Sequence, residues 1–325
     1  MPGSHMRREM TEQPEVLARL LSRRIDVGLE RPAGVIIVAR GSSDHAAVYG
    51  RYLLELATRR PVALAAPSLF TRYGARTDAS GWLVVGVSQS GKTPEIVDVV
   101  ERLRATGGHA VAITNDADSP LAAAAETVIE LGAGEERAVP ATKTYTAQMA
   151  AFAVLAAAFG EVPWEQGALS AVPGAVSAVL EDPDPMATLA VRWAAIDKLV
   201  VTARGWMFSA ALETALKVRE TALVSAQGFS VADLLHGPIA AVDAGAAVLA
   251  LRADGPSATD VDEAVEALQQ RGADLHLMPT VTGVPEALAP IAAAVRGQQL
   301  ALELALRKGL DPDAPRGLNK VTITR

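Results

Sequence analysis

The chain has 325 residues, half of them apolar, which is enough to bury the cores of two domains. Its net charge is −7, with few aromatic residues and no basic stripe, so nucleic acid is not expected as a partner. It contains no cysteine, which excludes disulfides, thiolate metal ligands and a cysteine nucleophile.

The first six residues resemble the remnant of an expression tag, since they end in Gly-Ser-His-Met. We therefore leave residues 1–6, including His5, out of the search for a site. No secretory signal is visible, and the longest apolar run, residues 149–159, is too short to span a bilayer. We expect a cytoplasmic protein without a membrane partner.

The first half of the chain alternates short apolar runs with stretches of helical spacing. Strands are predicted at 35–39, 61–65, 83–87, 110–114 and 127–131, and helices at 45–57 and from 94 onward. Such alternation is typical of an α/β fold with a parallel sheet covered by helices on both faces.

The same pattern recurs in the second half. An Ala-Arg-Gly triplet follows the first strand, and another follows the apolar run 199–202; later strands are predicted at 247–251 and 275–278. This internal repeat predicts two tandem α/β domains. Their predicted bounds are 7–182, with a leading helix, and 183–325, with a C-terminal tail, because the segment 181–185 is rich in proline.

The segment 85–93, VGVSQSGKT, carries the strongest functional signal. An apolar strand leads into a loop of hydroxyls with one internal glycine, and a helix follows at once. Free backbone N–H groups, the positive end of the helix dipole and the hydroxyls of Ser88, Ser90 and Thr93 favour a bound phosphate. The loop after the first strand, residues 41–43, should converge on the same phosphate, because parallel sheets bind ligands beyond their carboxyl ends.

The same segment also fits a nucleotide-binding P-loop. Residues 86–93 match G-x-x-x-x-G-K-T, and Asp116 would then be the Mg²⁺ carboxylate of a nucleotide hydrolase. However, this loop is a row of hydroxyls with Gln89 rather than a bare backbone cradle. A serine-rich turn that binds nothing is a further alternative.

The second half supplies candidates for acid–base chemistry. Glu213, Lys217 and Glu220 are four and three residues apart in a helical stretch, so they share one face. Taken alone, such a face is most often a surface ladder of ion pairs. His236 opens a His-Gly-Pro turn, where a histidine is more often structural than catalytic.

The end of the chain is predicted to be an irregular tail, because it contains Pro312 and Pro315 and closes with the alternating residues 321–324. Lys320 lies in this tail and would by default be an ordinary solvated lysine. A tail with so few core residues is expected to become ordered only when it closes over a ligand.

Six motifs in one order resemble a known family. They are ARGSSDHA, VSQSGKTPE, VPATKTYTAQ, LETALKVRE, LLHGP and PRGLNKVT. Together they are similar to the tandem SIS-domain sugar isomerases, which include the isomerase half of glucosamine-6-phosphate synthase. The separation of Glu220 from His236 also matches the family. The resemblance covers almost the whole chain and implies two tandem SIS domains, each a parallel sheet flanked by helices.

The resemblance implies roles for single residues. The substrate contacts fall on Ser42, Ser43, Ser88, Gln89, Ser90, Thr93, Val139 and Asn319. Glu220 would move a proton between C1 and C2 of the open-chain sugar, and Lys320 would form an imine with the ketose carbonyl. His236 would assist ring opening from the partner subunit, which implies a homodimer. Lys217 is the lysine of the catalytic helix.

The chemistry of these side chains suits aldose–ketose isomerisation. A tuned carboxylate can serve as the base, an amine can form a Schiff base, and an imidazole titrates near neutral pH. Neither a cofactor nor a metal is expected, because His45, His109, His236 and His276 are not at ligand spacing.

The chain also departs from the synthase. It shows no glutaminase domain with a nucleophilic cysteine, so ammonia would not be made from glutamine. The expected reaction is therefore the deamination of glucosamine 6-phosphate to fructose 6-phosphate. Arg40, Lys92, Pro140, Ala141 and Asn319 differ from the synthase residues near the sugar. A fructosamine-type 6-phosphate deglycase, a non-catalytic sugar-phosphate sensor and a P-loop NTPase remain as alternatives.

Overall fold

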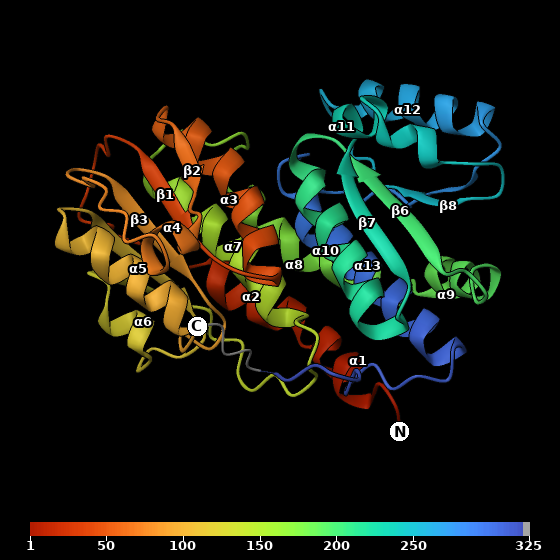
Figure 1. The fold of residues 1–325 in the computed structure, drawn as a ribbon, viewed down its shortest axis with the longest axis horizontal. Coiled ribbons are helices and arrows are strands. Elements are labelled where there is room, and N and C mark those ends of the chain that lie inside the picture. Colours follow the sequence, from red (N-terminus) through yellow and green to blue (C-terminus); the bar gives the residue numbers. More distant parts are fainter. Residues whose placement is uncertain (321–325) are drawn as a thin grey trace. The chain divides into compact units, whose positions relative to one another are not determined.

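The structure of the protein is a computed structural model that describes residues 1–320; the predicted alternation at 321–324 lies outside these residues. The chain packs into two compact units (Figure 1). The five-stranded unit comprises Glu15–Glu135 and Lys143–Glu165, together with residues 319 and 320. The four-stranded unit comprises Met1–Pro14, Glu136–Thr142 and Gln166–Leu318.

The five-stranded unit is built on a parallel sheet of order β2-β1-β3-β4-β5. Its strands are β1 (Val35–Val38), β2 (Val62–Leu64), β3 (Leu83–Val87), β4 (His109–Thr114) and β5 (Thr127–Glu130). Its helices are α2 (Gln13–Leu21), α3 (Ser42–Thr58), α4 (Pro67–Thr71), α5 (Pro94–Ala105), α6 (Pro120–Ala123) and α7 (Lys143–Ala158). All five predicted strands are confirmed, each to within one residue at either end.

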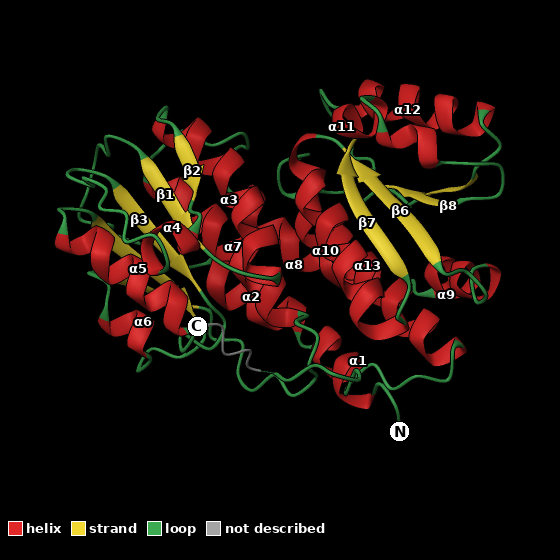
Figure 2. Cartoon of the chain, in the orientation of Figure 1, coloured by secondary structure: helices red, strands yellow, loops and turns green. Residues whose placement is uncertain are grey.

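Helices cover both faces of this sheet (Figure 2). On one face, Phe70 of α4, Val100 of α5 and Leu121 of α6 belong to one apolar cluster with the strands. On the other face, α3 packs against α7. Gly50 of α3 lies so close to the ring of Phe152 that an added Cβ would come within 2.3 Å of it. A glycine is therefore required where the two helices cross.

The four-stranded unit is built on a second parallel sheet, of order β7-β6-β8-β9. Its strands are β6 (Lys198–Ala203), β7 (Ser225–Ser230), β8 (Ala247–Ala250) and β9 (Asp274–Leu277). Its helices are α1 (Ser4–Thr11), α8 (Val172–Glu181), α9 (Asp184–Arg192), α10 (Phe208–Ala222), α11 (Val231–Leu235), α12 (Ala258–Gln270) and α13 (Ala289–Arg307). Helices α10 and α13 pack together, while α11 and α12 contribute to apolar clusters with β8.

The two sheets share the same strand order over their first four strands. The chain enters each sheet at an inner strand, places the next strand on one side of it, and then crosses over to the other side. The contacts repeat as well. Arg40, after β1, pairs with Glu95 in the first turn of α5, and Arg204, after β6, pairs with Asp260 in the first turn of α12. The predicted repeat of α/β architecture is confirmed, while the predicted boundary at 182–183 stays a prediction.

Strand β7 was not predicted. Its sequence, SAQGFS, contains residues of low strand propensity and no continuous apolar run. Among residues 1–320 it pairs only with β6 and lies at the edge of its sheet. Gly228 allows the strand to approach α10, because a Cβ there would come within 2.9 Å of the Leu212 Cα.

Helix α1 begins inside the segment interpreted as a tag remnant, and its Met6 is fully buried. Among residues 1–320, no helix is both long enough and apolar enough to cross a bilayer.

Candidate functional site

The two hydroxyl loops predicted to bind phosphate leave the five-stranded sheet at the same edge. Strands β1 and β3 are parallel neighbours, with Val38 opposite Gly86, so the residues that follow them emerge side by side. From β1 the chain continues to β2 on one side, and from β3 it continues to β4 on the other. Ligands of open parallel sheets bind at such a switch point.

The serine hydroxyls of both loops accept hydrogen bonds from the protein. The Ser43 Oγ accepts from the Gln148 Nε2 at 3.0 Å, and the Ser90 Oγ accepts from the Lys92 backbone N–H at 3.2 Å. A hydroxyl that accepts a bond still has its own O–H to donate. Both serines can therefore donate to an anion at the switch point.

The rest of the loop adds further donors. The hydroxyls of Ser88 and Thr93 bond to each other at 3.2 Å, so one of the two keeps a free O–H. Within residues 1–320, the backbone N–H groups of Gln89, Ser90 and Thr93 have no recorded acceptor. Helix α5 starts at Pro94 and presents the positive end of its dipole to the same point. This donor set suits a phosphate.

The loop is held in place by the segment that follows β4. Asn115 N–H donates to the Gln89 carbonyl at 3.1 Å, and Leu121 N–H donates to the Gly91 carbonyl at 3.0 Å. Gly91 has a φ of 61°, and a Cβ there would come within 2.0 Å of the Ser119 Oγ. The glycine therefore satisfies both a left-handed backbone and a close approach.

Two observations argue against the P-loop alternative. Gly86, the first glycine of the pattern, lies inside β3 and pairs with both neighbouring strands, so its backbone cannot cradle a phosphate. Asp116, the candidate Mg²⁺ carboxylate, instead pairs with Lys92 at 3.0 Å. The hydrogen bond from Lys92 holds the pKa of Asp116 below its usual value. In a P-loop, Lys92 would contact the nucleotide phosphates and Asp116 would hold the Mg²⁺. Here the two side chains bind each other instead.

Helix α10 buries the charged face predicted from the sequence. Lys217 and Glu213 are each only 1% exposed, and the Lys217 Nζ lies 3.3 Å from the Glu213 Oε1 and 2.5 Å from the Glu220 Oε2. The interpretation as a surface ion-pair ladder is therefore wrong, because two of the three charges are inaccessible to water. The Glu220 side chain is 23% exposed, so it can meet a ligand while it remains bonded to the lysine.

Two opposing effects act on the pKa of Lys217. Burial lowers it, since desolvation penalises the charged amine, whereas the charges of Glu213 and Glu220 raise it. The net direction is upward, which means that the ion pairs outweigh the desolvation. Lys217 is therefore a fixed positive charge behind Glu220 at neutral pH.

His236 is exposed and ends helix α11. Its Nδ1 donates to the Ala232 carbonyl at 2.8 Å, because a carbonyl oxygen can only accept. In the neutral ring, this bond leaves Nε2 as the open acceptor.

Glu220 and His236 lie at opposite ends of β7. Helix α10 ends just before the strand begins, and α11 starts where the strand ends (Figure 1). A strand of this length, Ser225–Ser230, spans roughly 20 Å. The structure therefore does not bring the two residues together within one chain.

The remaining predicted site residues belong to three short segments. Ser42 opens α3 beside Ser43, at the switch point. Asn319 is exposed and Lys320 is half-buried, and both group with the five-stranded unit. Val139 belongs to the loop Glu136–Thr142 of the four-stranded unit, and its N–H donates to the Asp313 carbonyl at 3.0 Å.

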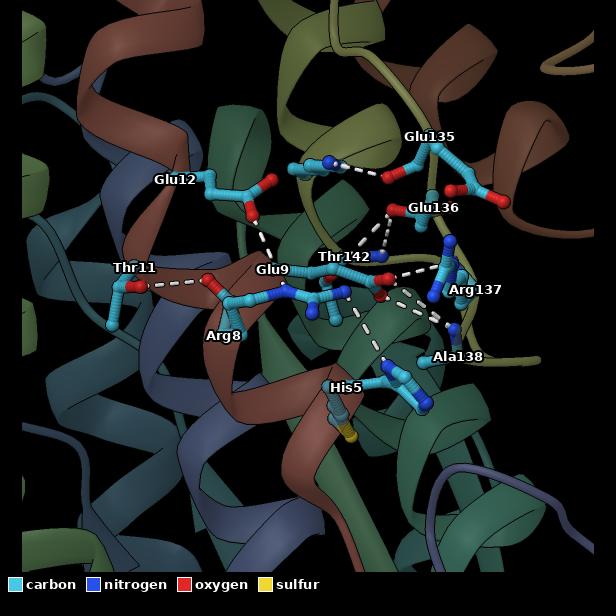
Figure 3. A network of polar contacts seen from close by, with 12 residues as sticks. His5, Arg8, Glu9, Thr11, Glu12, Glu135, Glu136, Arg137, Ala138 and Thr142 are labelled. Atoms are coloured by element: carbon cyan, nitrogen blue, oxygen red, sulfur yellow. Dashed lines mark hydrogen bonds and ion pairs between the residues drawn. The ribbon is translucent and has the colours of Figure 1, made fainter.

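The loop around Val139 is held by two buried carboxylates (Figure 3). Glu9 of α1 is fully buried and accepts from the backbone N–H of Arg137 at 2.5 Å and from that of Ala138 at 3.3 Å. Glu136 accepts from the Thr142 N–H at 3.0 Å. The N-terminal helix thus fixes the backbone of a predicted substrate loop.

Sequence reasoning missed Gln148 and Glu9 as members of these networks. Gln148 was inside one of the six motifs, but nothing in the sequence shows that its amide meets Ser43. Glu9 has no sequence signal, because its partners are backbone N–H groups far along the chain. Among residues 1–320, no group of three or more His, Asp or Glu side chains could hold a metal ion.

Comparisons with known proteins identify a family for the five-stranded unit. The SIS domain family matches residues 29–158, which contain all five strands of the five-stranded sheet. A glutamine–fructose-6-phosphate aminotransferase (isomerizing) from Zymomonas mobilis is 30% identical over 98% of this chain. The chain spans only 58% of the length of that relative.

Solved structures extend the likeness to the whole chain. The "putative phosphosugar isomerase" of Silicibacter pomeroyi DSS-3 is 32% identical, with a TM-score of 0.83 over 96% of this chain and 100% of its own. A glucosamine-6-phosphate deaminase from Thermotoga maritima has a TM-score of 0.84 over 99% of this chain and 100% of its own; at 21% identity, this likeness is one of fold. That the four-stranded unit is a second SIS domain stays a prediction. The chain contains a SIS domain at residues 29–158, belongs to the same family as the Silicibacter pomeroyi protein, and is a homologue of part of the glutamine–fructose-6-phosphate aminotransferases.

Proposed function

We propose that the protein is a phosphosugar isomerase of amino sugars, which converts glucosamine 6-phosphate to fructose 6-phosphate and ammonia. The observation that carries this proposal is the hydroxyl loop at the β1/β3 switch point, whose O–H and N–H donors suit a phosphate. The relationship to aminotransferases named for fructose 6-phosphate supports a hexose 6-phosphate as the substrate class.

In this proposal the five-stranded unit supplies the phosphate contacts. Ser42, Ser43, Ser88, Gln89, Ser90 and Thr93 bind the phosphate through hydroxyl, amide and backbone donors. Arg40 and Lys92 flank the loop, but each is paired with a carboxylate, so hydrogen-bond donors and the helix dipole carry the recognition. Val139 and Asn319 are assigned to the sugar.

Proton transfer is assigned to Glu220. In the open-chain amino sugar its carboxylate takes the proton from C2 and returns it to C1, which turns the aldehyde and amine into a C2 imine. Water then adds to C2 and ammonia leaves, so that fructose 6-phosphate remains. The buried charge of Lys217 holds the carboxylate in place through a bond of 2.5 Å.

Two further residues complete the proposed mechanism. His236 opens the sugar ring, because its Nδ1 bond to Ala232 leaves Nε2 to exchange a proton with the ring oxygen or hydroxyl. Lys320 forms an imine with the carbonyl of bound fructose 6-phosphate and releases water, as amines do with carbonyl substrates, and hydrolysis of that imine returns the free lysine and the ketose.

A panel of substrates tests the proposal. The protein should release ammonia from glucosamine 6-phosphate and should not act on unphosphorylated glucosamine. Release of a larger amine from fructosamine-type 6-phosphates, without ammonia from glucosamine 6-phosphate, would replace the deaminase with a deglycase. Binding of hexose 6-phosphates without turnover would indicate a sensor, and Mg²⁺-dependent hydrolysis of ATP would restore the P-loop alternative.

A further inference from the structure

Gln148 of α7 has a buried amide that the proposed reaction does not yet use. Its side chain is only 1% exposed, and its Nε2 donates to the Ser43 Oγ at 3.0 Å. Its Oε1 is buried and has no hydrogen-bond partner among the described residues. A buried amide oxygen without a donor is unfavourable, so its retention next to a candidate site calls for a physical reason.

We propose that Gln148 is a positioning residue that turns the Ser43 hydroxyl toward the phosphate of the substrate. This inference rests on the proposed function. Because Nε2 gives its hydrogen to the Ser43 Oγ, the O–H of Ser43 must point away from Gln148. No acceptor for that hydrogen is recorded within residues 1–320, whereas a phosphate oxygen at the switch point would supply one.

The unpartnered Oε1 fits the same role. The two amide atoms are bonded to one carbon, so Oε1 lies beside the contact between Nε2 and Ser43. A ligand hydroxyl or an ordered water at the phosphate would give this oxygen its donor. The Gln148 amide thus donates to the Ser43 hydroxyl that holds the phosphate. Its Oε1 can accept from a ligand hydroxyl or from a water bound beside the phosphate.

A double-mutant cycle on Ser43 and Gln148 tests the inference. The dissociation constants of inorganic phosphate and fructose 6-phosphate are measured by calorimetry for Ser43→Ala, Gln148→Met and the double variant. Loss of a hydrogen bond to a charged group predicts roughly tenfold weaker binding for Ser43→Ala. Gln148→Met should weaken binding about threefold or more. The double variant should bind no more weakly than Ser43→Ala, because both changes act on the same hydrogen bond from the Ser43 hydroxyl to the phosphate.

A second variant keeps the shape of the side chain. A carboxylate can only accept, so in Gln148→Glu the Ser43 hydroxyl would donate to Glu and be lost to the phosphate. Gln148→Glu should therefore bind phosphate at least as weakly as Ser43→Ala. In turnover, the KM for the hexose 6-phosphate should rise while kcat stays near that of the unmodified protein, since phosphate binding acts equally on ground and transition states.

Gln299 of α13 offers a matched control. It is also buried, its Nε2 donates to the Val179 carbonyl at 2.9 Å, and its Oε1 also has no hydrogen-bond partner among the residues that the structure describes. Gln299→Met should lower stability and leave phosphate affinity unchanged.

Three outcomes would overturn the inference. They are folded Gln148 variants with unchanged phosphate affinity, a Gln148→Glu variant without effect, and losses from Ser43→Ala and Gln148→Met that multiply. If the unmodified protein bound neither inorganic phosphate nor fructose 6-phosphate, the proposed function would fail with it. Tight binding by the unmodified protein together with silent Gln148 variants refutes only the role of Gln148.

Discussion

At the scale of single residues, the proposed chemistry depends most on Glu220. Glu220→Gln keeps the shape of the side chain and removes the base. We expect kcat for ammonia release to fall roughly 10²–10⁴-fold, because that is the usual contribution of one acid–base group. Binding of fructose 6-phosphate, measured by calorimetry, should be unchanged.

The control for Glu220→Gln is Glu266→Gln, at an exposed position of α12 in the same unit. This variant should retain full turnover. If Glu220→Gln also turned over at the normal rate, the proton would have to be moved by another residue.

Lys217 makes a prediction about stability and pH. Its pKa in the folded protein is raised above the ordinary 10.5, while the unfolded chain titrates near that value. A group whose pKa is raised on folding stabilises the fold at every pH below its unfolded pKa, and this contribution disappears as the pH rises through the folded pKa. Lys217→Met removes the buried cation that contacts Glu213 and Glu220 and should lower the free energy of unfolding by about 3–5 kcal/mol.

Urea unfolding of both proteins across a pH series measures this difference. It should stay constant from about pH 7 to pH 9 and shrink only above the ordinary pKa of 10.5. A difference that already declined near neutral pH would show that Lys217 is not held as a buried cation.

At the scale of elements, the phosphate loop depends on Gly91. Its φ of 61° and the 2.0 Å approach of a Cβ to the Ser119 Oγ mean that Gly91→Ala must displace the loop. Gly134 is a matched control, because its φ is 67° and a Cβ there would meet no atom of residues 1–320 within 4 Å. Both alanines cost about 1–2 kcal/mol for the left-handed backbone. Only Gly91→Ala should weaken the binding of inorganic phosphate, and equal affinities in calorimetry would refute this use of the loop.

The loop Glu136–Thr142 also depends on a neighbouring element, helix α1, for its position. Glu9→Ala would remove the carboxylate that accepts from the N–H groups of Arg137 and Ala138, and should lower stability by about 1–3 kcal/mol. Because Val139 lies in this loop, the KM for the sugar phosphate should rise as well. Glu12→Ala removes an exposed pair with Arg8 and should change the stability measured in urea by less than about 1 kcal/mol.

The elements also show what a sequence can reveal. Strands such as β3 were predicted because five consecutive buried residues leave a continuous apolar run. Strand β7 was not predicted, because an edge strand that contains Gly228 and polar residues has no continuous apolar run. The hydroxyl loop was visible because its residues are contiguous. The contact of Gln148 with Ser43 was not, because it is made across two helices that only folding brings together.

At the scale of the whole molecule, the repeated architecture has diverged in its chemistry. The loop after β3 presents serines and a threonine, whereas the loop after β8 presents Arg252, paired with Asp254 and Asp262. Near the same edge, Arg204 pairs with Asp260. Ion pairs flank both switch points, since Arg40 pairs with Glu95 and Lys92 with Asp116 at the five-stranded sheet. The duplicated topology therefore differs in the hydroxyl donors, which the loop after β3 adds at the five-stranded sheet.

The separation of Glu220 and His236 by the length of β7 leads to a prediction about assembly. If both residues act on one sugar, the histidine must come from a second copy of the chain, so we infer a homodimer with shared sites. In a symmetric dimer each site would contain Glu220 of one subunit and His236 of the other. The variants Glu220→Gln and His236→Asn should each be nearly inactive as homodimers.

A mixing experiment decides this point. When the two variants are unfolded, mixed and refolded together, about half of the dimers should be mixed, and each mixed dimer should hold one site with both residues intact and one with neither. Activity should then recover to about a quarter of that of the unmodified protein, since one site in four is restored. If both residues acted from the same chain, every site would carry a lesion and mixing would restore nothing. A fully active monomer in sedimentation would likewise rule out a site shared between two subunits.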